Sequence, residues 1–168
     1  KDARRGARMA LTVTGTGAAG TGGTISGATG AAAIVATNTQ DLQLAWMNIT
    51  SPSGHGIAAT NLRGSNALAN SEISGFGMGV GNGEDGLRVV NTNTNMTGMT
   101  VTNTKFSNAG NANDGIFMEA QGTSNMALSV VNNTFTQFFG DAIQVNGITG
   151  STGTVRLVVK DSDFTNAV

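Results

Sequence analysis

Alternating apolar residues recur along this 168-residue chain in segments that share one layout. Five segments each close on an aliphatic or aromatic residue: Ile49, Ile73, Phe106, Phe135 and Phe164. In the last four, an Asn or Asp stands three positions before the closing residue, at Asn70, Asn103, Asn132 and Asp161. Alternation is the period of a strand with one buried face. A repeat with one small polar residue at a fixed place in each turn therefore predicts a parallel β-helix.

These four polar residues are predicted to form a ladder inside the helix. The alternation of each segment would turn them toward the same side as the apolar residues. A buried amide is costly unless it is hydrogen-bonded, and stacking would let each side chain bond to its equivalent in the next turn. Asn also tolerates the left-handed backbone that such a bend requires. We therefore interpret Asn70, Asn103, Asn132 and Asp161 as structural ladder residues rather than catalytic ones.

A second strand is expected after each closing residue. It begins at an aliphatic position, in chain order Ile34, Ile57, Leu87, Ile116 and Ile143. Four of these follow a two-residue turn: His55-Gly56, Asp85-Gly86, Asp114-Gly115 and Asp141-Ala142. Asp-Gly is a strong turn signal, because Gly adopts positive φ and Asp bonds the local backbone. The prediction is one all-β solenoid domain over residues 1–168, with about five to six turns, of which residues 1–41 form the first.

Composition limits the classes of function. Charged residues make up 11% of the chain and the net charge is -1, so a basic surface for nucleic acid is not expected. The chain has no Cys, which excludes disulfides, thiolate metal sites and a Cys nucleophile. No stretch approaches the ~20 apolar residues of a membrane-spanning helix. With no Tyr and a single Trp, the chain is also poor in aromatic platforms for sugars.

Two stretches resemble a known family. They run from Asn103-Thr-Lys-Phe106 to Asn113-Asp-Gly-Ile116, and from Asn132-Asn-Thr-Phe135 to Asp141-Ala-Ile143. Both resemble the repeats of right-handed parallel β-helix proteins, which include pectate-lyase-like enzymes and the passenger regions of very large bacterial surface proteins. The resemblance covers residues 42–168 and implies a right-handed coil. A shared fold does not by itself indicate an activity.

A catalytic interpretation needs acids at set separations in a cleft. The candidates are Asp85, Asp114 and Asp141, with Glu84 beside them, because the repeat would stack them on one edge. Carboxylates about 5 Å apart would repel, raise a pKa or bind calcium. The lyases that the chain resembles use calcium, so a calcium site at these four residues is an alternative to simple turn formation. His55, the only His, stands where the other turns have Asp, and we interpret it as a turn residue.

Low charge and scarce aromatic residues favour a non-enzymatic module of a secreted or cell-surface bacterial repeat protein, without a cofactor. Adhesion, display or filament building would be its function, and a surface glycan or protein would be a further partner. No amphipathic helix caps either terminus, so we expect a segment of a longer solenoid or a unit that stacks end to end with other copies. The alternative is a polysaccharide lyase or glycoside hydrolase with its site at Asp85, Asp114 and Asp141.

Overall fold

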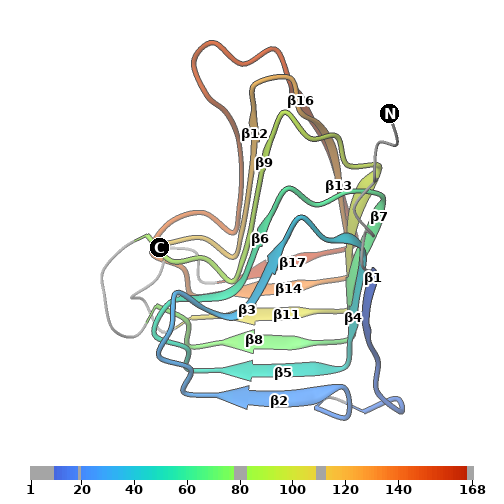
Figure 1. Cartoon of the computed structure of the whole chain (residues 1–168). Coiled ribbons are helices and arrows are strands. Elements are labelled where there is room, and N and C mark those ends of the chain that lie inside the picture. The colour runs from blue at the N-terminus through green and yellow to red at the C-terminus, as the bar shows by residue number, and fades with distance from the viewer. Residues whose placement is uncertain (1–9, 19, 78–82, 109–112, 166–168) are drawn as a thin grey trace.

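The computed structural model is an all-β parallel solenoid of about five turns, as the repeat predicts. It describes residues 10–18, 20–77, 83–108 and 113–165. Each turn contributes one strand to each of three parallel sheets, here named A, B and C. In Figure 1 the chain runs clockwise while it recedes from the viewer, which makes the coil right-handed. In the described part of the chain, no helix is long and apolar enough to cross a membrane.

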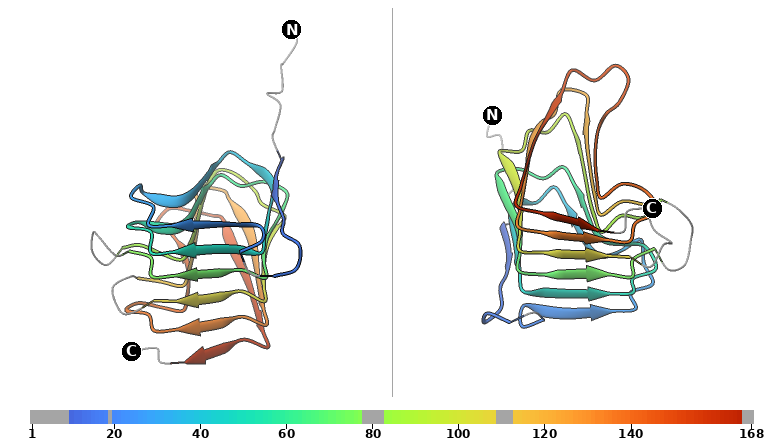
Figure 2. Two further views of the ribbon diagram at one scale, coloured as in Figure 1. Left: turned by 90° about the horizontal axis from the view of Figure 1, so that it is seen from below. Right: turned by 180° about the vertical axis from the view of Figure 1, so that it is seen from behind.

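The strands of each sheet follow one another in chain order, and neighbours are hydrogen-bonded in parallel. Sheet A consists of β1 (Ala10–Val13), β4 (Gln40–Ala45), β7 (Ser65–Ala69), β10 (Gly98–Thr102), β13 (Asn125–Val131) and β16 (Thr154–Lys160). Sheet B consists of β2 (Gly23–Ser26), β5 (Met47–Thr50), β8 (Glu72–Ser74), β11 (Lys105–Ser107), β14 (Thr134–Thr136) and β17 (Asp163–Thr165). Sheet C consists of β3 (Ala32–Thr37), β6 (His55–Thr60), β9 (Leu87–Thr92), β12 (Ile116–Gln121) and β15 (Ile143–Gly147). Figure 2 shows the strands of sheet B stacked as parallel rungs.

The closing residues of the repeat lie in sheet B, on short strands separate from the preceding strands of sheet A. Ile25, Ile49, Ile73, Phe106, Phe135 and Phe164 stand in register. The rings of Phe106, Phe135 and Phe164 are nearly parallel, with 5.1 Å between successive centroids. The column of closing residues is therefore confirmed, but the single strand predicted around each of them is wrong, because a corner divides it in two.

The residues of the predicted ladder form that corner, on its outer side. Asn103, Asn132 and Asp161 have φ of 48°, 55° and 48° and are exposed. Asn103 Nδ2 donates a hydrogen bond to Asn70 Oδ1 at 3.1 Å, and Asn132 Nδ2 donates one to Asn103 Oδ1 at 2.6 Å. The prediction that these residues point inward is wrong. Left-handed backbone interrupts the alternation of the strand, so the residue after the corner faces the interior instead.

The interior hydrogen bonds at this corner come from that next residue. Asn133 is 2% exposed. Its Oδ1 accepts the N–H of Thr104 at 2.9 Å, and its Nδ2 donates to the carbonyl oxygens of Val101 and Val131 at 2.9 and 3.0 Å. All of these partners are backbone groups, so one buried amide joins two turns.

The second predicted strand corresponds to sheet C. Its aliphatic column is in register through Ile34, Ile57, Leu87, Ile116 and Ile143. Most of its members are buried, and they form one continuous core with the columns of sheets A and B. The turns that lead from sheet B into these strands also stack on one another. The candidate site lies in this stack of turns.

Candidate functional site

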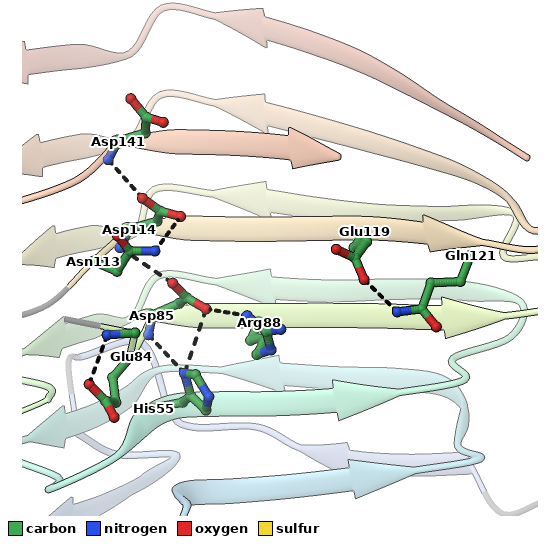
Figure 3. A network of polar contacts seen from close by, with 10 residues as sticks. His55, Glu84, Asp85, Arg88, Asn113, Asp114, Glu119, Gln121 and Asp141 are labelled. Atoms are coloured by element: carbon green, nitrogen blue, oxygen red, sulfur yellow. Dashed lines mark hydrogen bonds and ion pairs between the residues drawn. The ribbon is translucent and has the colours of Figure 1, made fainter. Parts of the chain in front are cut away.

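The turns from sheet B to sheet C bring His55, Asp85, Asp114 and Asp141 into one column (Figure 3). His55 Nδ1 accepts the backbone N–H of Asp85 at 2.8 Å. Asp85 Oδ1 accepts the N–H of Asp114 at 3.3 Å, and Asp114 Oδ1 accepts the N–H of Asp141 at 2.7 Å. His55, Asp85 and Asp114 thus each bind the backbone of the following turn. His55 accepts a backbone N–H of the next turn just as the carboxylates do, which agrees with its interpretation as a turn residue.

The second carboxylate oxygens of Asp85 and Asp114 are engaged as well. Asp85, whose side chain is 0% exposed, accepts a hydrogen bond from Arg88 Nη1 at Oδ2, at 3.0 Å. The Arg88 guanidinium lies 4.2 Å from the centroid of the Phe117 ring in the next turn. Asp114 Oδ2 accepts a hydrogen bond from Asn113 Nδ2 at 3.1 Å. The sequence analysis did not identify Arg88. The one feature of the sequence that indicates it is its position three residues after Asp85.

Burial alters the acidity of this column. It raises the pKa of Asp85 to about 6, although the hydrogen bond from Arg88 acts in the opposite direction. It also raises the pKa of Asp114. For His55, burial and then the Arg88 charge lower the pKa. Because His55 Nδ1 accepts a backbone N–H, its ring is neutral with the proton on Nε2.

The column does not fit a calcium site. Within residues 10–18, 20–77, 83–108 and 113–165, no three His, Asp or Glu side chains converge where a metal ion could bind. Both oxygens of Asp85 and both of Asp114 already accept hydrogen bonds. Glu84 Oε2 accepts the N–H of Gly83 at 3.2 Å. Calcium takes six to eight oxygen ligands, and here the carboxylate oxygens of Asp85 and Asp114 hold neighbouring N–H groups of the coil instead.

A hollow of about 390 Å³ opens beside His55 and Glu84. Its lining consists of Thr29, Gly30, Ala31, Ser53, Gly54, His55 and Glu84. The stacked acids Asp85, Asp114 and Asp141 are absent from that lining, so the structure brings them together without placing them around this cavity. Another acid, Glu119, accepts a hydrogen bond from Gln121 farther along sheet C (Figure 3).

Neutralising Asp85 is expected to change how stability depends on pH. A folded-state pKa of about 6, above the ordinary value of 3.8, means that the folded chain binds the proton more tightly. The contribution of Asp85 is therefore fully present below pH ~4 and is lost as the pH rises through ~6. Asp85→Asn should remove this dependence. Relative to the parent chain, its free energy of unfolding should increase between pH 4 and 7 by about 2–3 kcal/mol.

Urea unfolding of both proteins at several pH values measures this difference. His55 acts in the opposite direction, because its lowered pKa makes protonation unfavourable to folding as the pH falls through ~6.5. It is present in both proteins, so its contribution largely cancels. An unchanging difference between the two proteins from pH 4 to 7 would show that Asp85 titrates in the folded chain as it does in the unfolded one.

The C-terminal end of the coil is a second candidate site. The last strands β15, β16 and β17 have no further strand beside them in the described chain. Four of their apolar residues are exposed, namely Val145 (37%), Leu157 (37%), Val159 (40%) and Phe164 (47%). Their equivalents one turn earlier are at most 1% exposed: Met118, Leu128, Val130 and Phe135. We call these four exposed residues the end face. Within residues 10–18, 20–77, 83–108 and 113–165, no strand lies over this cross-section of the core.

No protein-family model matches the chain, and neither a curated protein nor a solved structure matches it. The structure agrees with the resemblance in sequence at the level of a parallel β-solenoid.

Proposed function

We propose that the chain is a non-enzymatic structural module of a secreted or cell-surface bacterial repeat protein, used in adhesion, display or filament building. The observation that carries the proposal is the end face. An exposed apolar surface of this kind, bordered by open strand edges, favours association with another β-structure. Further turns or other copies of the chain would cover it, and a surface glycan or protein would bind along the rod.

The arrangement of the polar side chains supports a structural role. Amides and carboxylates in the corners bind the backbone of adjacent turns, as Asn133 and Asp114 do. Each turn is thereby joined to the next along the whole coil. In repeat proteins, stability is nearly a sum over such neighbouring contacts. Side chains committed to these contacts stiffen a rod and are poorly placed to bind substrate.

One observation favours the alternative, a polysaccharide lyase or glycoside hydrolase. Asp85, with a pKa raised to about 6, lies beside His55, and His55 lines the hollow. Groups that titrate near neutral pH are typical of acid–base catalysis. In this alternative His55 would exchange a proton with substrate in the hollow, and Asp85, which does not line it, would only position the imidazole.

The two functions are distinguished by an assay against acidic and neutral polysaccharides. We expect no turnover, because the buried acids of the column hold backbone N–H groups. The controls are Asp114→Asn, which keeps the shape of the side chain, and His55→Gln, which keeps an acceptor near the Asp85 N–H. Turnover that is abolished by either substitution in a folded protein would establish the enzyme and contradict our proposal.

A further inference from the structure

We propose that the hollow beside His55 binds an amino sugar, with Glu84 holding its ammonium group and His55 donating a hydrogen bond to one of its oxygen atoms. The inference rests on the proposed function and deepens it, because it gives the chemistry of the surface glycan and the place where it binds. The hollow has a volume of about 390 Å³. That volume is near the lower end of the range for small-molecule sites, so it suits a single sugar rather than a stretch of polymer.

The hollow forms because two neighbouring turns have small residues at one place in the corner before sheet C. In register, this place is occupied by Ala31, Gly54, Glu84, Asn113 and Gly140. Ala31 and Gly54 leave the space open, and Glu84 of the following turn lines it from one side. Because the lining comes from three successive turns, the hollow lies along the side of the coil rather than at an end.

His55 differs from its equivalents in the hydrogen bond that it can donate. The next three turns have Asp at this place, and Asp85 and Asp114 accept a backbone N–H as His55 does. Because His55 Nδ1 accepts, its Nε2 carries the proton, and no group in the described part of the chain accepts that proton. In the previous turn the equivalent residue is Ala32, whose short side chain leaves the ring accessible from the hollow. The imidazole therefore offers a donor that a carboxylate could not.

Glu84 gives the hollow its charge. Among the described residues that line it, Glu84 is the one with a formal charge, because His55 is neutral. The nearby charges of Arg88 and Asp85 neutralise each other at 3.0 Å. Glu84 Oε2 accepts the N–H of Gly83, and Oε1 makes no hydrogen bond within the described residues. An ammonium group donates the hydrogen bonds that this carboxylate accepts.

The rest of the lining favours a polar ligand. It consists of Thr29, Gly30, Ala31, Ser53 and Gly54. An apolar amine would find no large apolar side chain to contact there, whereas the hydroxyl groups of a sugar would bond to the Thr29 hydroxyl and the His55 N–H. An acidic sugar would bring a second negative charge against Glu84, which disfavours binding. An amino sugar combines the hydroxyl groups and the positive charge that this lining accepts.

Titration of the isotope-labelled chain with glucosamine, followed by NMR, measures both the affinity and the place of binding. A ligand of this size should bind with a dissociation constant on the order of 1 mM, and the amide signals of Gly30 and Gly54 should shift. N-acetylglucosamine is the matched ligand, because acetylation keeps the ring and removes the charge. Its dissociation constant should be about 10-fold higher. Ethanolamine, which has the ammonium group without the ring, should also bind about 10-fold more weakly, and glucuronic acid should not bind.

Two substitutions test the residues, and the same spectra show that each variant is folded. Glu84→Gln keeps the shape of the side chain and should raise the dissociation constant for glucosamine by about 10-fold. Gly30→Leu should occupy the hollow and abolish binding. A Cβ at Gly30 would meet only the carbonyl oxygen of Ala32, at 3.8 Å, so the coil accepts a side chain there. Glu119→Gln is the matched control, because Glu119 lies on sheet C outside the hollow and its loss should leave the affinity unchanged.

Four results would overturn the inference: no shift at concentrations well above 1 mM, equal affinity for glucosamine and N-acetylglucosamine, equal affinity for ethanolamine, or unchanged affinity in Glu84→Gln. The proposed structural function would survive each of them, since it does not depend on this hollow. Turnover of a polysaccharide, by contrast, would overturn that function and leave the measured binding of glucosamine standing.

Discussion

Replacing Phe135 by Ala is expected to lower the free energy of unfolding by about 3–5 kcal/mol. The side chain is 1% exposed, and its ring stacks between Phe106 and Phe164, with centroids 5.1 Å away on both sides. A third ring, Phe138, lies 6.2 Å away. The hydrogen bonds of sheet B hold the spacing of the turns, so the neighbouring rings cannot move together to fill the space. The cavity left by the Phe135 ring should therefore stay open, and the free energy of unfolding should fall by the full amount.

Urea unfolding followed by circular dichroism measures this loss. Thr136→Ala on the same strand is the matched control, because Thr136 stands next to Phe135 on the outward side of sheet B. Its effect should stay within about 0.5 kcal/mol. A loss below about 1 kcal/mol for Phe135→Ala would mean that the aromatic column does not form the packed centre of the coil.

Asn133→Ala is expected to cost about 3 kcal/mol, several times more than removal of the amide next to it in sequence. The substitution removes the side-chain partner of the Thr104 N–H and of the Val101 carbonyl oxygen in a buried corner. The Val131 carbonyl oxygen also loses its bond to Asn133 but still accepts the N–H of Asn103. An unsatisfied buried polar group costs roughly 1–3 kcal/mol.

The matched control is Asn132→Gly, which removes the exposed ladder amide and keeps a residue that adopts the φ of 55° without strain. It should cost about 1 kcal/mol or less, because water replaces the bond to Asn103. Asn132→Ala would add the strain of a left-handed Ala and is less informative. Equal losses for Asn133→Ala and Asn132→Gly would place the stabilising amide on the outside of the corner.

The repeat and its register could be predicted from the sequence, because they depend on spacing alone. Phe106, Phe135 and Phe164 recur at the same place in successive segments, and stacking is the only arrangement that buries them all. The Asp-Gly turns before Leu87 and Ile116 likewise mark the starts of the strands of sheet C. The stack of Asp85, Asp114 and Asp141 follows from the same spacing.

The inward direction assigned to Asn103 and Asn132 was wrong for a local reason. Alternation predicts which side a residue faces only while the backbone stays extended. A φ of 48° at Asn103 ends the strand and turns the chain. The alternation of inward and outward side chains therefore starts again at Thr104, which faces the interior. Asn is enriched at left-handed positions, and this signal could have indicated that the second Asn of Asn132-Asn133 is the buried one.

The coiling of the chain, the residues that stack and the places of the turns are predictable from the sequence, because each of them follows from periodic burial along one strand after another. The side of a corner that an amide occupies, and the meeting of His55, Asp85 and Arg88, became visible only in the folded coil. These features depend on contacts between residues of different turns, and on the angle at which the chain leaves each strand, which no spacing in the sequence specifies.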